Sequence, residues 1–197
     1  MWGYFINFED ERKIKIDMNT IKSKFDDIID VIINRKSVRQ YTDQPVSREQ
    51  LEALVKAAVS APSAVNKQPW AFVVIDDRAT LDSLAALLPY AKMVTKASAA
   101  IVVCGDLSKA YYGLDDEYWI QDCSAATENL LLAAEAMGLG AVWTAVYPEE
   151  DRVEIVRKQL ALPELIVPLN LIPVGYPLHD ASPQNKFKPE IIHFNRW

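Results

Sequence analysis

Two polar clusters in this chain have the side chains needed to hold a ligand with a phosphate at one end and a flat, amide-like ring at the other. The first, R-K-S-V-R at residues 35–39, places three cations and one hydroxyl within five residues. Charge-assisted hydrogen bonds to a phosphate require such groups. The second, A-P-S-A-V-N-K-Q-P-W at residues 61–70, offers Ser63, Asn66 and Gln68 as donors and acceptors for the edge of a heteroaromatic ring.

Each cluster also has an ordinary structural interpretation. Residues 35–39, considered alone, are typical of a solvated helix end. Ser63 and Asn66 follow Pro62, so they could simply be turn residues. The case for a ligand site therefore depends on what else the chain contains.

Composition and charge narrow the classes of function that the chain could have. A chain of 197 residues with half of its residues hydrophobic suits one soluble globular domain. Its formal charge of −6 argues against a nucleic-acid partner, because a phosphate-tracking surface needs a basic excess. No apolar run approaches the roughly 20 residues that span a bilayer, so we expect no membrane partner. Cys104 and Cys123 are too few for a disulfide framework and lack zinc-site spacing, which favours a reducing cytoplasm and no metal.

Periodicity predicts the elements that position the first cluster. Apolar residues at three-to-four spacing indicate an amphipathic helix over residues 20–34 that ends at Arg35. S-R-E-Q at residues 47–50 is a capping-box pattern that opens a second helix, which stops before Pro62. Short β-branched runs predict strands at 71–75 and 99–104, with a helix at 80–88 between them.

The segment 121–137 predicts a long helix that is apolar on nearly every side and is ended by Gly138. Such a helix must be buried on every side, so we expect a second subunit to cover part of it, with Ala126 in that interface. Strands at 141–146 and 168–174 and a surface helix at 149–160 complete the pattern. Helices and strands alternate, so the fold class is α/β or α+β.

Two segments invite other interpretations. Gly138-Leu139-Gly140-Ala141 follows a helix and precedes a strand, whereas a dinucleotide fingerprint lies between a strand and a helix. A nicotinamide cofactor, if used, would then bind only as a transient substrate. Residues 1–17 lack the basic start and continuous apolar core of a secretion signal. They could be an upstream extension or an arm that docks on a partner, and we expect domain boundaries of 1–19 for the extension and 20–197 for the domain.

Four motifs in order give the chain a family resemblance. R-K-S-V-R, P-S-A-V-N-K-Q-P-W, Q-D-C-S-A-A-T-E-N-L-L-L-A-A-E-A-M-G-L-G-A-V-W and K-F-K-P-E-I-I-H-F-N-R-W together resemble the FMN-dependent nitroreductase family over residues 28–197. The resemblance implies an α+β homodimer with a central, mainly antiparallel sheet flanked by helices and FMN at the subunit interface. It also implies ping-pong hydride transfer from NADH or NADPH through FMN to a small-molecule acceptor such as a nitroaromatic or a quinone.

The resemblance also implies which residues bind the cofactor. Ala64 stands where many relatives have a second serine, so one side-chain hydrogen bond would be lost. Trp143, Thr144 and Ala145 resemble the strand end that faces the flavin ring, and no side chain is implied to be catalytic. The full set is Arg35, Lys36, Ser37 and Arg39 around the flavin, Pro62, Ser63, Ala64, Asn66 and Gln68 from the partner subunit, Trp143, Thr144 and Ala145 at the ring, and Lys186 and Lys188 as a C-terminal phosphate clamp.

Two questions stay open. Tyr111, Tyr112, Tyr118 and Trp119 form an aromatic stretch that could pack in the core or cover the flavin and set substrate choice. The same scaffold could also serve a flavin-binding protein without turnover, or a flavin-consuming or dehalogenating relative. Steady-state oxidation of NAD(P)H would distinguish these functions.

Overall fold

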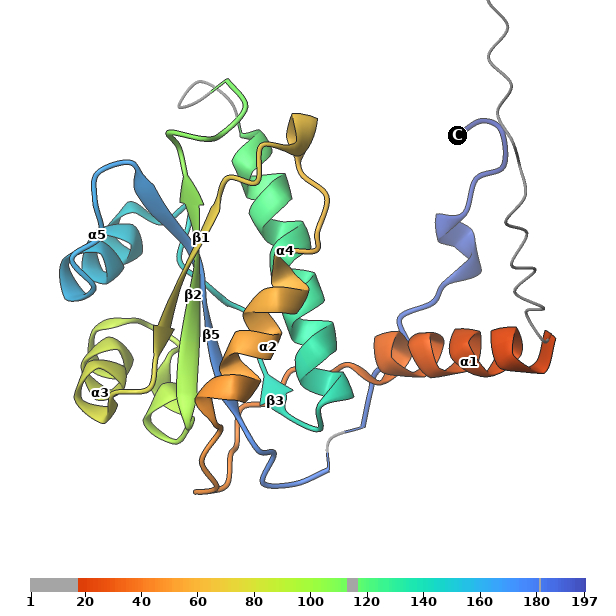
Figure 1. The fold of residues 1–197 in the computed structure, drawn as a ribbon, viewed down its shortest axis with the longest axis horizontal. Coiled ribbons are helices and arrows are strands. Elements are labelled where there is room, and N and C mark those ends of the chain that lie inside the picture. Colours follow the sequence, from red (N-terminus) through yellow and green to blue (C-terminus); the bar gives the residue numbers. More distant parts are fainter. Residues whose placement is uncertain (1–17, 113–116, 181) are drawn as a thin grey trace, which may run out of the picture.

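A five-stranded antiparallel sheet lies between two layers of helices (Figure 1). The computed structural model describes residues 18–112, 117–180 and 182–197. The strands are β1 (Trp70–Ile75), β2 (Ala99–Asp106), β3 (Gly140–Ala141), β4 (Thr144–Ala145) and β5 (Ile166–Gly175). They run in the order β1-β2-β5-β3, and β4 also pairs with β5. Every strand pair is antiparallel, which confirms the predicted α+β class and its mainly antiparallel sheet.

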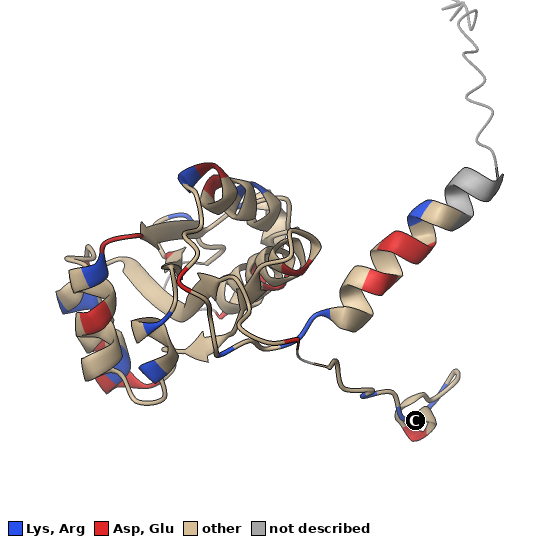
Figure 2. Ribbon diagram, turned by 90° about the horizontal axis from the view of Figure 1, so that it is seen from below, with Lys and Arg blue, Asp and Glu red and all other residues tan. Residues whose placement is uncertain are grey.

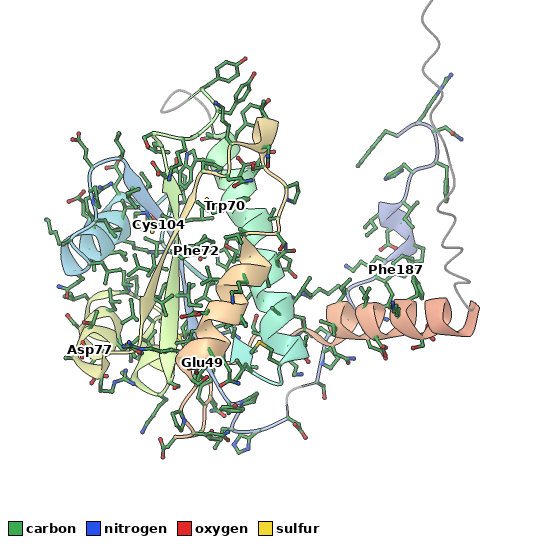
Figure 3. The ribbon with its side chains drawn as sticks, viewed as in Figure 1. Glu49, Trp70, Phe72, Asp77, Cys104 and Phe187 are labelled. Carbon is green, nitrogen blue, oxygen red and sulfur yellow. The ribbon has the colours of Figure 1, made fainter. Side chains whose placement is uncertain are left out.

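Side chains of the sheet alternate between two cores. Ile101 and Val103 of β2 face the core shared with α2 and α4, whereas Val102 and Cys104 face the core under α3 and α5. This period of two is what an antiparallel strand buried on both faces requires. Figure 3 shows Trp70 toward the α4 side and Cys104 toward the α5 side. Both cysteines are buried free thiols.

Local sequence explains where the shorter helices begin. Helix α2 (Arg48–Ala58) starts with the predicted capping box, in which Ser47 and Gln50 each bond the other's backbone amide. Helix α3 (Arg78–Leu87) begins two residues before the predicted start, because the Asp77 carboxylate accepts from the Thr80 amide at 2.8 Å. Helix α5 is Glu150–Gln159, and single 3-10 turns lie at η1 (Ala64–Asn66), η2 (Lys92–Thr95) and η4 (Pro189–Ile191).

Helix α4 (Tyr118–Ala136) is the predicted long helix, begun three residues earlier. Gly138 follows it with a φ of 70°, a left-handed conformation that suits glycine at a helix end. The expectation that Ala126 lies in a subunit interface is wrong, because its side chain is fully buried in the chain's own core. The side of α4 that this chain leaves partly uncovered instead carries Gln121, Ala125, Glu128, Leu132 and Ala136.

The predicted continuous strand 141–146 is wrong. It is divided into β3 and β4, although both pair with β5 in one register, Ala141 with Val174 and Thr144 with Leu171. That register places Pro173 opposite Val142. Proline has no amide hydrogen to donate, so the ladder of hydrogen bonds breaks there.

Helix α1 (Met18–Asn34) and the C-terminal arm, residues 182–197, project from the same side of the body (Figures 1 and 2). Both carry exposed apolar side chains, including Ile28 at 61% on α1 and Phe187 at 62% on the arm. Exposed apolar surface of this kind is typical of an interaction site. Residues 1–17, expected to be an extension, lie outside the described residues.

No helix among the described residues is long and apolar enough to cross a membrane.

Candidate functional site

The basic cluster at residues 35–39 begins where α1 ends and runs beside β3. Ser37 forms a parallel bridge with Ala141, and the Val38 amide donates to the Ala141 carbonyl at 3.0 Å. Val38 is buried, whereas Ser37 and Arg39 on either side of it are exposed. The extended backbone thus turns alternate side chains outward and fixes them against the sheet.

A cavity of about 700 Å³ lies between this cluster and the C-terminal arm. Arg35, Lys36, Ser37 and Arg39 line one wall, and residues 182–187, including Lys186, line the other. Five of the predicted cofactor residues therefore meet at one cavity within a single chain. Lys188 lies further along the exposed arm and is not part of its lining.

Two of these cations are held by acidic residues of α4. Arg35 Nε lies 3.2 Å from Glu128 Oε1, and Lys36 Nζ donates to Glu135 Oε1 at 2.8 Å. The Lys36 and Glu135 side chains are only 23% and 16% exposed, so this pair is partly shielded from water. Lys36 is thus committed to α4, and the ion pairs orient the two side chains rather than leaving them free.

The segment 62–68 forms the second cluster and has an unusual backbone. Val65, Asn66 and Gln68 have φ values of 51°, 55° and 52°, in the left-handed region that residues with a Cβ seldom adopt. The Gln68 amide donates to Ser63 Oγ at 2.9 Å, and the Ala64 amide donates to Asp122 Oδ1 on α4 at 2.8 Å. Strained backbone of this kind is found at ligand-binding segments.

Within one chain, the two clusters contact different parts of α4. Segment 62–68 meets the helix at Asp122, whereas the basic cluster meets it at Glu128 and Glu135. Glu128 and Glu135 are roughly 9 and 20 Å further along the axis and about 120–140° around it, at 1.5 Å and 100° per residue. The structure therefore does not bring Pro62, Ser63, Ala64, Asn66 or Gln68 to the cavity of the same chain.

The third predicted group lies at the broken strand. Trp143 and Ala145 are exposed, whereas Thr144 is buried and its hydroxyl has no hydrogen-bond partner in the described part of the chain. On the facing strand, Asn170 is fully buried and donates through Nδ2 to Thr127 Oγ1 of α4 at 3.0 Å. Trp143 and Ala145 thus lie exposed at a strand end that pairing with β5 fixes.

Comparisons with known proteins identify the family to which the chain belongs. The model of the nitroreductase family matches residues 32–99 and 85–176. The chain belongs to the nitroreductase family. A candidate NADH dehydrogenase/NAD(P)H nitroreductase of Methanothermobacter thermautotrophicus is 40% identical over 185 residues, which cover 94% of this chain and 95% of that protein.

Solved structures of the nitroreductase family have the same fold. A crystal structure from Parabacteroides distasonis, with the same description as the archaeal protein, is 52% identical with a TM-score of 0.82 and covers 86% of this chain and 98% of its own. A candidate nitroreductase from Desulfovibrio desulfuricans, solved in complex with FMN, is 31% identical with a TM-score of 0.74, covering 86% and 97%.

The aromatic stretch of this nitroreductase family member serves two roles. Trp119 is a core residue, 5% exposed, and packs so closely on Gly105 that a Cβ there would overlap its ring. Tyr111, Tyr112 and Tyr118 instead form a ring cluster near the start of α4, with Tyr112 64% exposed. The interpretation as core packing is thus confirmed for Trp119 alone.

Sequence reasoning missed Asp122, a buried carboxylate that contacts segment 62–68. It is 5% exposed, and its Oδ2 has no hydrogen-bond partner among the described residues. The available signal was an acidic residue at a core position of an otherwise apolar helix. Burial raises the pKa of Asp122, and the hydrogen bond from the Ala64 amide offsets only part of that effect.

The raised pKa of Asp122 predicts a pH-dependent stability. The protonated carboxyl's contribution to the free energy of unfolding is fully present below the unfolded-state pKa. It is lost as pH rises through the folded-state pKa. Asp122→Asn cannot ionise, so it should melt at a higher temperature than the wild type at about pH 7, with the difference shrinking toward about pH 4. Thermal unfolding across this range tests it, with exposed Asp43→Asn as control. A lower melting temperature for Asp122→Asn at neutral pH would contradict the prediction.

Proposed function

We propose that this chain is an FMN-dependent oxidoreductase that takes a hydride from NADH or NADPH and reduces a small acceptor such as a nitroaromatic or a quinone. The observation that carries the proposal is the cavity where Arg35, Ser37, Arg39 and Lys186 converge. In a chain with a net charge of −6, so many donors at one cavity indicate an anionic ligand. The FMN complex of a relative with the same fold supports flavin mononucleotide as that ligand.

The residues present fit FMN. The guanidinium groups and the Lys186 ammonium can bond phosphate oxygens, and the Ser37 hydroxyl adds a neutral donor. Lys36 contributes less to the phosphate than the sequence alone implies, because Glu135 already holds its amine. Trp143, Thr144 and Ala145 would lie at the ring, where backbone donors stabilise the negative charge that the ring gains on reduction. FMN supplies the hydride-transfer chemistry, and the protein supplies binding and electrostatics.

A homodimer would complete the site. Segment 62–68 and the basic cluster contact different faces of α4, so a second copy can bring its segment 62–68 to the cavity of the first. The uncovered side of α4 and the exposed apolar residues of α1 and the C-terminal arm offer the surface for this association. Such an interface would resemble a divided core and bury more than about 2,000 Å². The two buried thiols are compatible with the cytoplasmic location that we expect.

Removing a phosphate donor should weaken FMN binding. Arg35→Ala should lose about 1.5–3 kcal/mol, the range for a hydrogen bond to a charged group, and Lys186→Ala and Lys188→Ala should act in the same direction. Arg48→Ala is the matched control, because Arg48 also pairs with a carboxylate, Asp76, but outside the cavity. Flavin fluorescence titration measures the dissociation constants. Equal FMN affinity in all four variants would contradict the assignment of the phosphate site to residues 35–39 and the C-terminal arm.

Steady-state kinetics tests the activity itself. NAD(P)H and the acceptor would occupy the same flavin face in turn, so double-reciprocal plots at several acceptor concentrations should give parallel lines. Intersecting lines would contradict this order of binding. FMN binding without acceptor-dependent NAD(P)H oxidation would favour the alternative, a flavin-binding, flavin-consuming or dehalogenating protein on the same scaffold.

A charge on the uncovered side of α4 should separate the subunits. Leu132→Glu places a carboxylate on that side and should release FMN together with subunits, because the site needs both copies. Leu87→Glu is the matched control, since Leu87 is 47% exposed on α3, across the sheet from α4. Sedimentation with absorbance at a flavin wavelength follows both events. A wild-type monomer that retains FMN at micromolar concentration would refute the shared site.

A further inference from the structure

Segment 62–68 needs an external restraint to keep its conformation. Val65, Asn66 and Gln68 all have positive φ, and none is a glycine. Val65 is β-branched and 70% exposed, so packing within the described chain covers little of it. Conformations of this kind persist only where the surroundings fix them.

The hydrogen bonds of this segment identify the restraint. Those from Asn66, Lys67 and Gln68 end on atoms of the segment itself. In the described part of the chain, the bond from the Ala64 amide to Asp122 Oδ1, 2.8 Å long, is the one through which residues 63–68 reach another element. Its acceptor belongs to α4, the longest helix of the core, so the carboxylate ties the strained turn to a long, largely buried helix.

Packing alone does not explain this carboxylate. Asp122 is 5% exposed, and its second oxygen has no hydrogen-bond partner in the described chain. A buried carboxylate with one oxygen unsatisfied destabilises a fold relative to an apolar residue of similar size. The contribution that offsets this cost is the hydrogen bond to the Ala64 amide, which is shorter and stronger when its acceptor is charged.

We propose that Asp122 is a positioning residue for the flavin, which fixes the Ala64 amide and thereby holds segment 62–68 in the shape that the cofactor site of the partner copy requires. The proposal rests on the FMN function above. Asp122 does not line the cavity at residues 35–39. It acts through the backbone of residues 63–68, and through that backbone on a ligand in the other subunit.

The test uses the FMN-loaded protein and variants at one side chain. Asp122→Ala removes the acceptor and should weaken FMN binding by about tenfold or more, the effect of losing a hydrogen bond to a charged group. Asp122→Asn keeps a carbonyl oxygen at Oδ1 and should bind FMN within about threefold of the wild type. Asn129→Ala is the matched control, because Asn129 also ties α4 to the backbone of another element, here by donating to the Ala57 carbonyl outside the segment.

Hydrogen exchange at the Ala64 amide separates positioning from a general loss of structure. It should be slow in the wild type and in Asp122→Asn and fast in Asp122→Ala, with the α4 amides unchanged in all three. Fast exchange in the wild type overturns the proposal even if Asp122→Ala fails to fold.

Three further results would also overturn it. These are unchanged FMN affinity in Asp122→Ala, no rescue by Asp122→Asn, and equal losses in Asp122→Ala and Asn129→Ala. A wild type that binds no FMN would instead refute the proposed function, while the exchange measurement would still test the restraint on segment 62–68.

Discussion

The geometry of α4 is the constraint on which the rest of the site depends. One rigid helix holds segment 62–68 at Asp122 and the basic cluster at Glu128 and Glu135, on different faces and at different heights. A helix cannot bend to bring these points together, so a site that uses both clusters needs two helices. The two-fold dimer that we propose would provide them, because each copy would then give one cluster and receive the other. The exposed apolar surface of α1 and the arm is compatible with that arrangement.

Electrostatics of the site follow from the same helix. The protein is acidic overall, yet its cavity gathers Arg35, Arg39 and Lys186. Glu128 and Glu135 lie behind the cluster and accept from Arg35 and Lys36, which restricts long, flexible side chains to a few orientations. A restricted cation loses less conformational entropy when a phosphate arrives. Glu128 and Glu135 thus reduce the net positive charge at the cavity, but they hold the cations there in fewer orientations.

Much of the fold was predictable, because local rules governed it. The capping box at Ser47, the helix end at Gly138 and the alternation in β2 each depend on a few neighbouring residues. The errors involve partners distant in sequence. Pro173 lies on the facing strand β5 and divides the predicted strand 141–146. Periodicity could not show that Ala126 faces the chain's own core, because the helix is apolar on nearly every side.

The same limit applies to the site. Residue types and spacing predicted the cluster at 35–39, and the family resemblance implied Lys186, which lines the same cavity. They did not predict that Glu135 takes Lys36, that segment 62–68 is strained, or that Asp122 holds it. Those features depend on how α4 is rotated about its axis, which an apolar pattern leaves open.

Buried polar contacts fix that rotation. Asn170 of β5 donates to Thr127, whose hydroxyl donates to the Cys123 carbonyl, and Asp122 accepts from Ala64. Apolar side chains pack acceptably in several registers, whereas a buried hydrogen bond is satisfied in one. If α4 turned by one residue, about 100°, Asp122 would lose the Ala64 amide, Thr127 would lose Asn170 and Glu128 would leave Arg35. The polar residues inside this apolar helix therefore place the basic cluster and segment 62–68 in register with one another.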